Sequence, residues 1–185
     1  MGILSNWLRK KRTRITFPYV EGSVLDIGCG PASILEACKD KIDSYVGFEY
    51  DESLVKQLNS KFPYARFFQK DLEEDKFELD CKFDRILLVA VIEHIFNQKR
   101  LIEECLSYLK PEGKIVITTP TVFGNDVVHR LGSTLGLFKK DTEHIVIYNK
   151  NRFRILACKF NLRIEEYRKF ELGCNQLVVL SRNQA

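Results

Sequence analysis

The feature that most constrains this chain is an alternation of short β-rich runs with amphipathic stretches, which begins near residue 22 and lasts to Pro120. Runs 23–27, 45–48 and 65–68 carry the branched and aromatic residues typical of strands, and a stretch of helical periodicity separates each from the next. Strands joined by helical crossovers pair in parallel, because the helix carries the chain back to the same edge of the sheet. The pattern therefore predicts a parallel sheet covered by helices.

Two further strands and three helices complete this part of the chain. The apolar run Phe83 to Val91 predicts a central strand buried on both faces, and 114–119 predicts a fifth strand. Helices are expected over 33–40, 53–62 and 98–109, with Lys110 to Gly113 ending the last of them. Ser33 and Glu36 have the spacing of a capping box, which predicts that Ser33 caps the first helix.

The pattern changes after Pro120. Residues 121–148 form a long, glycine-containing connection, which inside a compact domain is typical of a lid or a binding loop. One more helix is expected over 151–159, followed by strands over 162–170 and 176–180. The five residues between these two strands are too few for a parallel crossover, so the chain is predicted to close with an antiparallel hairpin.

A glycine turn follows the first strand, at Asp26 to Pro31. Ligands of open α/β sheets bind beyond the carboxyl ends of strands where the strand order reverses, so this turn is the first candidate for a binding site. Gly28 and Gly30 lack a Cβ and let a ligand lie against the backbone, while the N–H groups that start the next helix can hold a carboxylate. A tight turn without any ligand is the alternative explanation.

Acidic residues at the next two strand ends favour the ligand. Glu49 ends the second strand 23 positions after Asp26, close to the spacing of about 20 expected for an acid that holds ribose hydroxyls. Asp71 follows the third strand, where it can accept from an adenine amino group while the Leu72 N–H faces a ring nitrogen. Three acids at three successive strand ends predict a nucleoside pocket.

In this order, several segments resemble the class I S-adenosylmethionine-dependent methyltransferases, above all the small-molecule branch that includes ubiquinone and menaquinone biosynthesis enzymes. The likeness is strongest from about Gly22 to Pro120. The segments are Val24-Leu25-Asp26-Ile27-Gly28-Cys29-Gly30, Gly47-Phe48-Glu49-Tyr50-Asp51, Asp71-Leu72, Phe83-Asp84-Arg85-Ile86, Val91-Ile92-Glu93-His94-Ile95 and Leu109-Lys110-Pro111-Glu112-Gly113.

The resemblance implies a Rossmann-like, doubly wound and mostly parallel seven-stranded sheet with an antiparallel last strand. It implies S-adenosylmethionine as cofactor and methyl donor. The charge pattern adds a basic segment over 1–20 that is expected to be helical, and the length and the long connection predict a single domain over 21–185 with a lid-like insertion at about 121–148. Cofactor-binding positions follow from the matched motifs: the methionine end at Asp26, Gly28, Cys29 and Gly30, the ribose at Glu49 and Tyr50, the adenine at Asp71 and Leu72, and the methionine ammonium at the Val89 carbonyl.

Two departures from the family pattern matter. Ala32 stands where the glycine loop often has a third glycine. In relatives that methylate ubiquinone precursors, a further carboxylate precedes the Glu-His pair and helps hold a divalent ion, but Ala90 stands there in this chain. Glu93 and His94 therefore lack a ligand partner, and no required metal is predicted.

In-line methyl transfer from a sulfonium depends mostly on alignment and on exclusion of water, while an oxygen acceptor usually also needs a base. The candidate catalytic residues are His94, just past the fourth strand, and His144, after the long connection. His94 can alternatively order the strand end, and His144 can alternatively serve packing; Tyr148 is a weaker candidate of the same kind. The acceptor is expected to lie against 121–148.

Charge is distributed unevenly along the chain, whose net charge is +4. Residues 1–20 hold five cations and no acid, residues 21–80 seven cations and fourteen carboxylates, and residues 81–185 seventeen cations and eleven carboxylates. This asymmetry predicts a small-molecule or lipid-precursor acceptor with an anionic portion. Residues 9–14 form either a solvated helix face or a contact with an anionic surface.

The remaining patterns predict a cytoplasmic protein. No apolar stretch approaches the roughly 20 residues of a membrane-spanning helix, and the first eight residues lack the order of a secretory signal. Six irregularly spaced cysteines are typical of reduced thiols.

Three other functions compete with a methyltransferase. A nicotinamide-dependent dehydrogenase would share the glycine turn and Glu49, but Ser33 breaks its GxGxxG motif. A non-catalytic S-adenosylmethionine-binding subunit would use the basic segment as a docking arm. An RNA methyltransferase is less favoured, since no aromatic stacking motif stands out, and nucleic acid is an unlikely partner.

Overall fold

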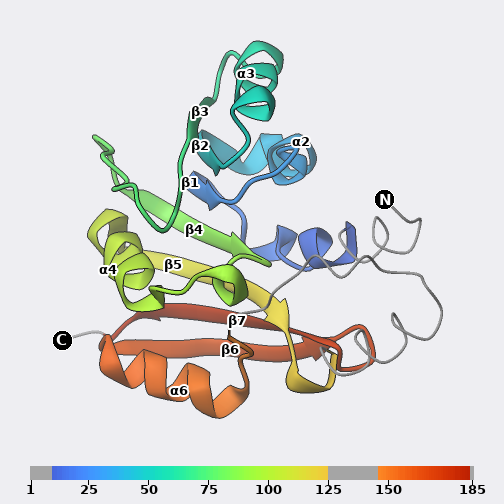
Figure 1. The fold of residues 1–185 in the computed structure, drawn as a ribbon, viewed down its shortest axis with the longest axis vertical. Helices are drawn as coiled ribbons and strands as arrows, with labels where there is room; N and C mark the ends of the chain where they lie inside the picture. The colour runs from blue at the N-terminus through green and yellow to red at the C-terminus, as the bar shows by residue number, and fades with distance from the viewer. Residues whose placement is uncertain (1–9, 125–145, 184–185) are drawn as a thin grey trace.

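The computed structural model describes residues 10–124 and 146–183. In these residues a seven-stranded sheet runs through the molecule with helices on both sides (Figure 1). In chain order the elements are η1 (Phe17–Tyr19), β1 (Gly22–Ile27), α2 (Ser33–Cys38), η2 (Lys39–Lys41), β2 (Ile42–Glu49), α3 (Glu52–Lys61), β3 (Arg66–Gln69), β4 (Phe83–Val89), η3 (Ile92–His94), α4 (Gln98–Tyr108), β5 (Leu109–Pro120), α6 (Lys150–Lys159), β6 (Leu162–Phe170) and β7 (Asn175–Arg182).

The strand order is β3-β2-β1-β4-β5-β7-β6. The pairs β1–β2, β2–β3, β1–β4 and β4–β5 are parallel, whereas β7 pairs antiparallel with both β5 and β6. The predicted fold class is therefore confirmed, including the reversed last strand and the closing hairpin. Because the strand order reverses between β1 and β4, their carboxyl ends flank the crevice where open α/β sheets bind ligands.

Apolar side chains cover both faces of the sheet. On one face, Ile86, Leu88 and Ile117 pack with α4 and α6 in a core that includes the fully buried Phe153. On the other face, Leu87 and Val116 pack with α2, α3 and the N-terminal segment. Central strands buried on both faces read as continuous apolar runs, which explains why β4 was recognisable from sequence.

In the basic N-terminal segment, which is described from residue 10 onward, residues 10–14 are helical. The segment then packs onto the sheet rather than extending away from it. Thr16 and Val20 are buried, and the Tyr19 hydroxyl donates to Glu166 on β6 over 2.6 Å. The division into a separate segment 1–20 and a domain 21–185 remains a prediction, as does the lid-like insertion, of which residues 125–145 lie outside the described chain.

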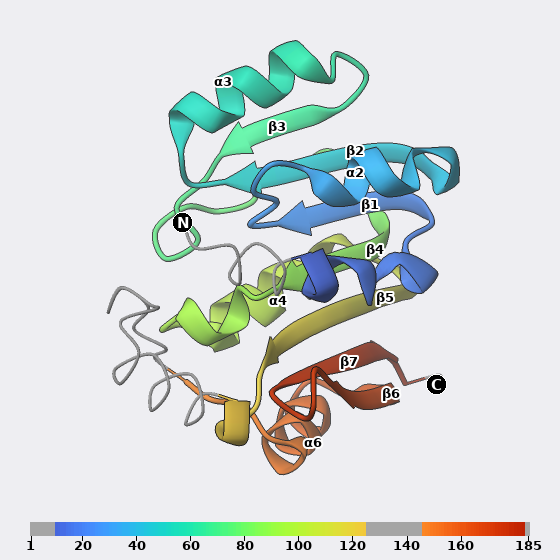
Figure 2. The same cartoon turned by 90° about the vertical axis from the view of Figure 1, so that its right-hand side faces the viewer.

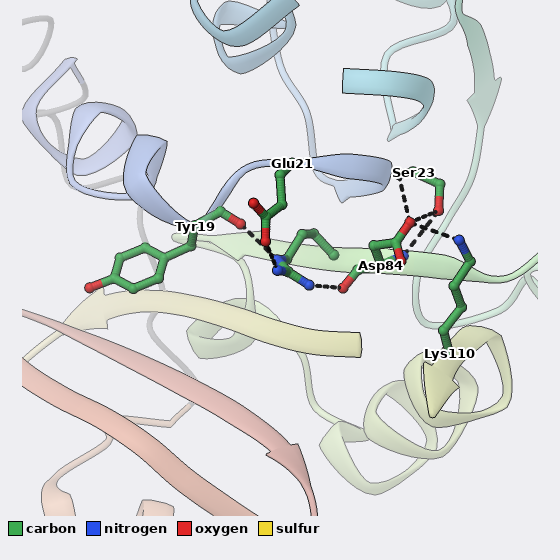
Figure 3. A network of polar contacts seen from close by, with 6 residues as sticks. Tyr19, Glu21, Ser23, Asp84 and Lys110 are labelled. Carbon is green, nitrogen blue, oxygen red and sulfur yellow. Dashed lines mark hydrogen bonds and ion pairs between the residues drawn. The ribbon is translucent and has the colours of Figure 1, made fainter. Parts of the chain in front are cut away.

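The amino ends of β1, β4 and β5 are joined by one polar network (Figure 3). The Asp84 carboxylate accepts from the Ser23 hydroxyl (2.7 Å), the Ser23 N–H (2.9 Å) and the Lys110 ammonium (2.7 Å). Arg85 donates to the carbonyls of Tyr19 and Asp84 and pairs with Glu21. Partial burial raises the pKa of Asp84, but the bonds from Lys110 and Ser23 outweigh it and lower the pKa to about 2.

Several local expectations were wrong. Ser33 does not cap α2: the N-cap is Ala32, whose φ of 55° completes the glycine turn, and Glu36 instead pairs with Lys61. Lys110 to Gly113 do not separate α4 from the fifth strand, because β5 begins at Leu109 and contains them as an irregularity in its pairing with β4. The fourth strand stops at Val89 rather than at residue 91, since Ala90 has a φ of 57°. The other helices and strands differ from expectation only at their ends.

All six cysteines are free thiols. None of the helices in the described parts of the chain is both long and apolar enough to cross a bilayer.

Candidate functional site

A cavity of about 310 Å³ lies at the carboxyl ends of β1 to β4. These strand ends point to the left in Figure 2, where the strands lie one below another from β3 at the top to β6 at the bottom. The cavity is lined by Gly28, Phe48, Glu49, Tyr50, Lys70, Asp71, Leu72, Glu73, Ala90, Val91, His94 and Ile95. It therefore occupies the position that the glycine turn and the acids predicted, and its volume is at the lower end of the range for small-molecule sites.

Gly28 keeps the floor of the cavity open. Its φ is 70°, and a Cβ at this position would lie 2.6 Å from Cγ2 of Val91. Ala90, which also lines the cavity, has a left-handed φ of 57°, an unusual conformation for a residue other than glycine. Sequence alone gave no sign of this second turn, whose backbone strain is typical of ligand-binding edges.

Glu49 ties the end of β2 to the glycine turn. One carboxylate oxygen accepts from the Gly30 N–H (2.9 Å), and the other accepts from the N–H groups of Tyr50 (2.8 Å) and Asp51 (3.2 Å). A carboxylate offers about four acceptor positions, so three backbone bonds orient it while leaving capacity for one more donor. The geometry is compatible with a bond to a ribose hydroxyl, although fewer positions are open than the sequence suggested.

Asp71 and Leu72 line the cavity from the loop after β3. One Asp71 carboxylate oxygen accepts from the Glu73 N–H (2.9 Å) in a local turn, and the Asp71 N–H donates to Asp75 (2.8 Å). The second carboxylate oxygen of Asp71 has no such bond within the described residues. Asp71 thus lines the cavity and keeps capacity to accept a further hydrogen bond.

Two charged side chains that sequence analysis missed fix this loop. Arg100 of α4 donates to the carbonyls of Leu72, Glu73 and Asp75. The Glu73 carboxylate accepts from the N–H groups of Phe96 and Asn97, which joins the loop after β3 to the loop after β4. No sequence pattern predicts such contacts, because they join a side chain to main-chain atoms that are more than twenty residues away in the sequence.

Asp26 and Cys29 do not line the cavity. Asp26 is 2% exposed and accepts from the Tyr45 hydroxyl over 2.6 Å. Burial raises the pKa of Asp26 to about 7, while the Tyr45 bond lowers it and the Glu49 charge raises it. Burial, together with the charges of Asp26 and Glu49, also raises the pKa of the Cys29 thiol. Both residues are therefore buried next to the cavity-lining Gly28 without lining the cavity themselves.

Of the other predicted cofactor positions, Tyr50 lines the cavity, whereas Gly30 and Val89 do not. Tyr50 lines the cavity with a side chain that is 70% exposed, which places it at the mouth. Gly30 is not among the lining residues, and nothing lies within 4 Å of the place where its Cβ would project. Val89 is the last residue of β4, directly before the lining residues Ala90 and Val91.

Of the two candidate bases, only His94 is described. It lies in η3 and lines the cavity, and its backbone N–H donates to the Val91 carbonyl over 2.9 Å. His144 falls outside the described residues. Tyr148 is 3% exposed, its hydroxyl donates to Gln98, and its ring stacks on Phe153 at 4.5 Å. Burial raises the pKa of Tyr148 to about 12, so packing accounts for it better than proton transfer.

Glu93 is the most unusual titratable residue near the cavity. It is 1% exposed, and neither carboxylate oxygen makes a hydrogen bond of normal geometry. Burial raises the pKa of Glu93 to about 7, against the effects of its own backbone, the Thr119 hydroxyl and the Arg12 charge, which lower it. Its apolar neighbours in sequence were the available sign that this acid is buried. In residues 10–124 and 146–183, no three His, Cys, Asp or Glu side chains gather as metal ligands would.

Comparisons with known proteins agree on one family. A family model described as "Methyltransferase domain" matches residues 5–167. A probable S-adenosylmethionine-dependent methyltransferase from Mycolicibacterium smegmatis is 26% identical over 117 residues, which cover 62% of this chain and 45% of the relative. A ubiquinone biosynthesis O-methyltransferase from Coxiella burnetii is 28% identical over 107 residues, 52% of this chain and 42% of the relative. The matched part spans less than half of these relatives.

Solved structures share the fold at low sequence identity. A magnesium protoporphyrin IX methyltransferase from Synechocystis with bound SAH has a TM-score of 0.68 at 16% identity, covering 96% of this chain and 83% of that one. An S-adenosylmethionine-dependent methyltransferase from Clostridium acetobutylicum has a TM-score of 0.67 at 13% identity, covering 95% and 90%.

Proposed function

This chain belongs to the class I S-adenosylmethionine-dependent methyltransferases, as its sequence resemblance indicated, and we propose that it transfers the methyl group of S-adenosylmethionine to a small-molecule or lipid-precursor acceptor. The observation that carries the proposal is the cavity at the reversal of strand order. Bare backbone at Gly28 forms one side of it, and the carboxylates of Glu49 and Asp71 form another.

The residues present fit this cofactor. Glu49, with acceptor capacity left, would hold a ribose hydroxyl, and the unengaged oxygen of Asp71 would accept from the adenine amino group. The Leu72 N–H would meet a ring nitrogen. The turn at Asp26 to Gly30 and the Val89 carbonyl are proposed to hold the methionine end, because the methionine ammonium suits the carbonyl oxygen of Val89 as an acceptor.

When bound, S-adenosylmethionine supplies a methyl group already activated by a positively charged sulfur. The protein's part is to align the acceptor in line and to exclude water. His94 lines the cavity and is the proposed base for an acceptor that must lose a proton. His144 remains a second proposed base.

The acceptor is proposed to carry an anionic portion. This rests on the excess of cations after residue 81 and on the basic N-terminal helix, in which Lys10, Lys11 and Arg14 are exposed. The same cations are proposed to contact an anionic surface. A cytoplasmic location is proposed with it, in agreement with six free thiols.

Calorimetric titration tests donor binding directly. We expect S-adenosylmethionine and its demethylated product to bind and NADH not to bind. Glu49→Ala and Asp71→Ala should each weaken donor affinity by about tenfold to a hundredfold, as expected for lost hydrogen bonds to charged groups. Glu52→Ala, on the exposed first turn of α3, is the matched control and should bind normally. Unchanged affinity in both site variants would contradict the assignment of the cavity.

A labelled-methyl screen tests turnover. Three ring compounds that differ only in bearing a carboxylate, a phosphate or no charge should be compared. The two anionic compounds should be methylated faster than the neutral one, and this difference in rate should shrink at high salt. Equal rates would reject the anionic acceptor while leaving the methyltransferase intact. Donor binding without transfer to any compound of a broad panel would instead favour a non-catalytic binding subunit.

A further inference from the structure

Three large apolar side chains are exposed at one corner of the molecule. Val122 is 45% exposed, Phe123 is 58% exposed and Leu172 is 99% exposed. Single exposed apolar residues are ordinary on soluble proteins, but a cluster of them marks an interaction surface. We call Val122, Phe123 and Leu172 the apolar corner.

Hydrogen bonds hold the two segments of the apolar corner together. Thr121 donates its N–H to the Cys174 carbonyl (2.8 Å) and its hydroxyl to the Gly173 carbonyl (2.6 Å). Gly124 packs so closely on Cys174 that a Cβ would lie 1.9 Å from the Cys174 carbonyl oxygen. The segment after β5 is therefore held against the β6–β7 turn.

Neither the turn nor the core explains Leu172. Glu171, Leu172 and Gly173 all have positive φ, of 52°, 55° and 85°. Glycine and asparagine suit such positions, whereas a leucine there is strained. A leucine that is strained and almost fully exposed contributes no burial to the stability of this chain, so contact with another molecule or surface explains it better.

The basic N-terminal helix lies beside this turn. The charges of Arg12 and Lys11 both lower the pKa of Glu171, although burial raises it. Lys10, Lys11 and Arg14 are exposed on the helix. Figure 2 looks onto the side of the molecule where the helix (dark blue), the short segment after β5 (yellow) and the β6–β7 turn (red) all face the viewer. The helix and the apolar corner are therefore close together, since the charges of Lys11 and Arg12 act on Glu171, the residue before Leu172.

We propose that this face docks on an anionic lipid bilayer, with the apolar corner inserted among the lipids and the cations of residues 10–14 over the headgroups. Lys and Arg residues are attracted to anionic leaflets, and exposed apolar side chains enter the interface. An RNA partner would use the cations but would leave the aliphatic Val122 and Leu172 without a role. The corner lies at the same sheet edge as the cavity, so docking would bring the site to the membrane surface.

Vesicle co-sedimentation of the full chain tests the proposal without any methyl transfer. Vesicles of phosphatidylglycerol with phosphatidylcholine should retain the protein at low salt, and pure phosphatidylcholine should retain much less. Leu172→Asn should weaken binding about tenfold, because Asn suits the left-handed turn but inserts no apolar group. Lys10→Glu with Arg14→Glu should weaken it by about 25-fold or more.

Matched controls separate docking from general effects. Ile155→Asn removes an apolar side chain that is 68% exposed on α6, and Lys39→Glu with Lys56→Glu makes the same change of net charge elsewhere. Both should bind like the unmodified chain. Thermal unfolding should show all variants folded, with Leu172→Asn at least as stable as the original because the strain is relieved.

Three results would overturn the proposal. The first is no retention by anionic vesicles. The second is full retention of Leu172→Asn and Phe123→Ser, which would leave an electrostatic contact only. The third is equal loss of binding in the control variants. Because donor binding is measured separately by calorimetry, failure here does not bear on the methyltransferase proposal.

Discussion

The two ends of the strands differ in whether their polar side chains have hydrogen-bond partners. At the amino ends of β1, β4 and β5, polar side chains are paired with one another: the Asp84 carboxylate accepts hydrogen bonds from Ser23 and Lys110 (Figure 3). Within the described chain, the buried side-chain atoms that have no hydrogen-bond partner include those of Glu93, Thr118 and Thr119, at or just after the carboxyl ends of β4 and β5. The others belong to Glu171 and Asn175, at the β6–β7 turn, and to Arg12 of the N-terminal helix.

This difference separates stability from function. Buried polar groups without partners cost free energy, and a protein keeps them where a ligand or a conformational change uses them. The carboxyl edge also carries the left-handed turns at Gly28 and Ala90 and the strained Leu172. The amino edge holds the strands in register, and the carboxyl edge presents the chemistry.

The largest effect is expected from Gly28→Val, at the carboxyl edge. A β-branched side chain there would clash with Val91 and would require a φ near 70°, which only glycine adopts readily. We expect donor affinity to fall by more than about a hundredfold by calorimetry. Gly30→Ala has a positive φ of 52° but open space around its Cβ, so it should lose less. Equal losses would mean that backbone conformation, not the floor of the cavity, is decisive.

Glu93→Gln should alter the pH dependence of stability. The folded pKa of about 7 lies above the ordinary value of 4.5, so the folded state holds the proton more tightly. Protonated Glu93 contributes about 3 kcal/mol to the free energy of unfolding, and this contribution is fully present below pH 4.5 and is lost as the pH rises through 7. Urea denaturation at pH 5 and pH 8 should show a smaller difference in the Gln variant than in the original. Asp26→Asn, at the other raised pKa, is the companion variant, and an unchanged pH profile in both would refute the buried-carboxylate account.

Arg100→Ala should weaken donor binding about tenfold, because the loop that carries Asp71 and Leu72 would lose three bonds to its carbonyls. Lys99→Ala, next to it on α4 and paired only loosely with Glu103 at 3.6 Å, should bind normally. Similar affinities for the two variants would show that the loop needs no support from α4.

The smallest effect is expected at the amino edge. Asp84→Asn should lower the free energy of unfolding by about 1 kcal/mol at pH 7 while leaving donor affinity unchanged. Since the folded pKa of Asp84 is lowered to about 2, its contribution is present above pH 3.8 and is lost as the pH falls toward 2. A change in donor affinity would break the division between the two edges.

Much of the fold could be predicted because its causes are local. The apolar run at Phe83 marked the central strand, and the short link between β6 and β7 left only an antiparallel pairing. The Gly28 turn and the acids at Glu49 and Asp71 were predictable as a site, since carboxyl ends of parallel strands meet at one edge. Their roles toward the cofactor remain predictions.

What only the tertiary structure decided depends on contacts between distant residues. It excludes Asp26 and Cys29 from the residues that line the cavity, it places Arg100 against the loop that carries Asp71 and Leu72, and it buries Glu93 without a hydrogen-bond partner. The sequence by itself determined the order of elements and the chemical kind of the site, because periodicity and turn residues act over a few positions. Burial and hydrogen-bond pairing are properties of the packed chain, so they appear only once strands far apart in sequence lie side by side.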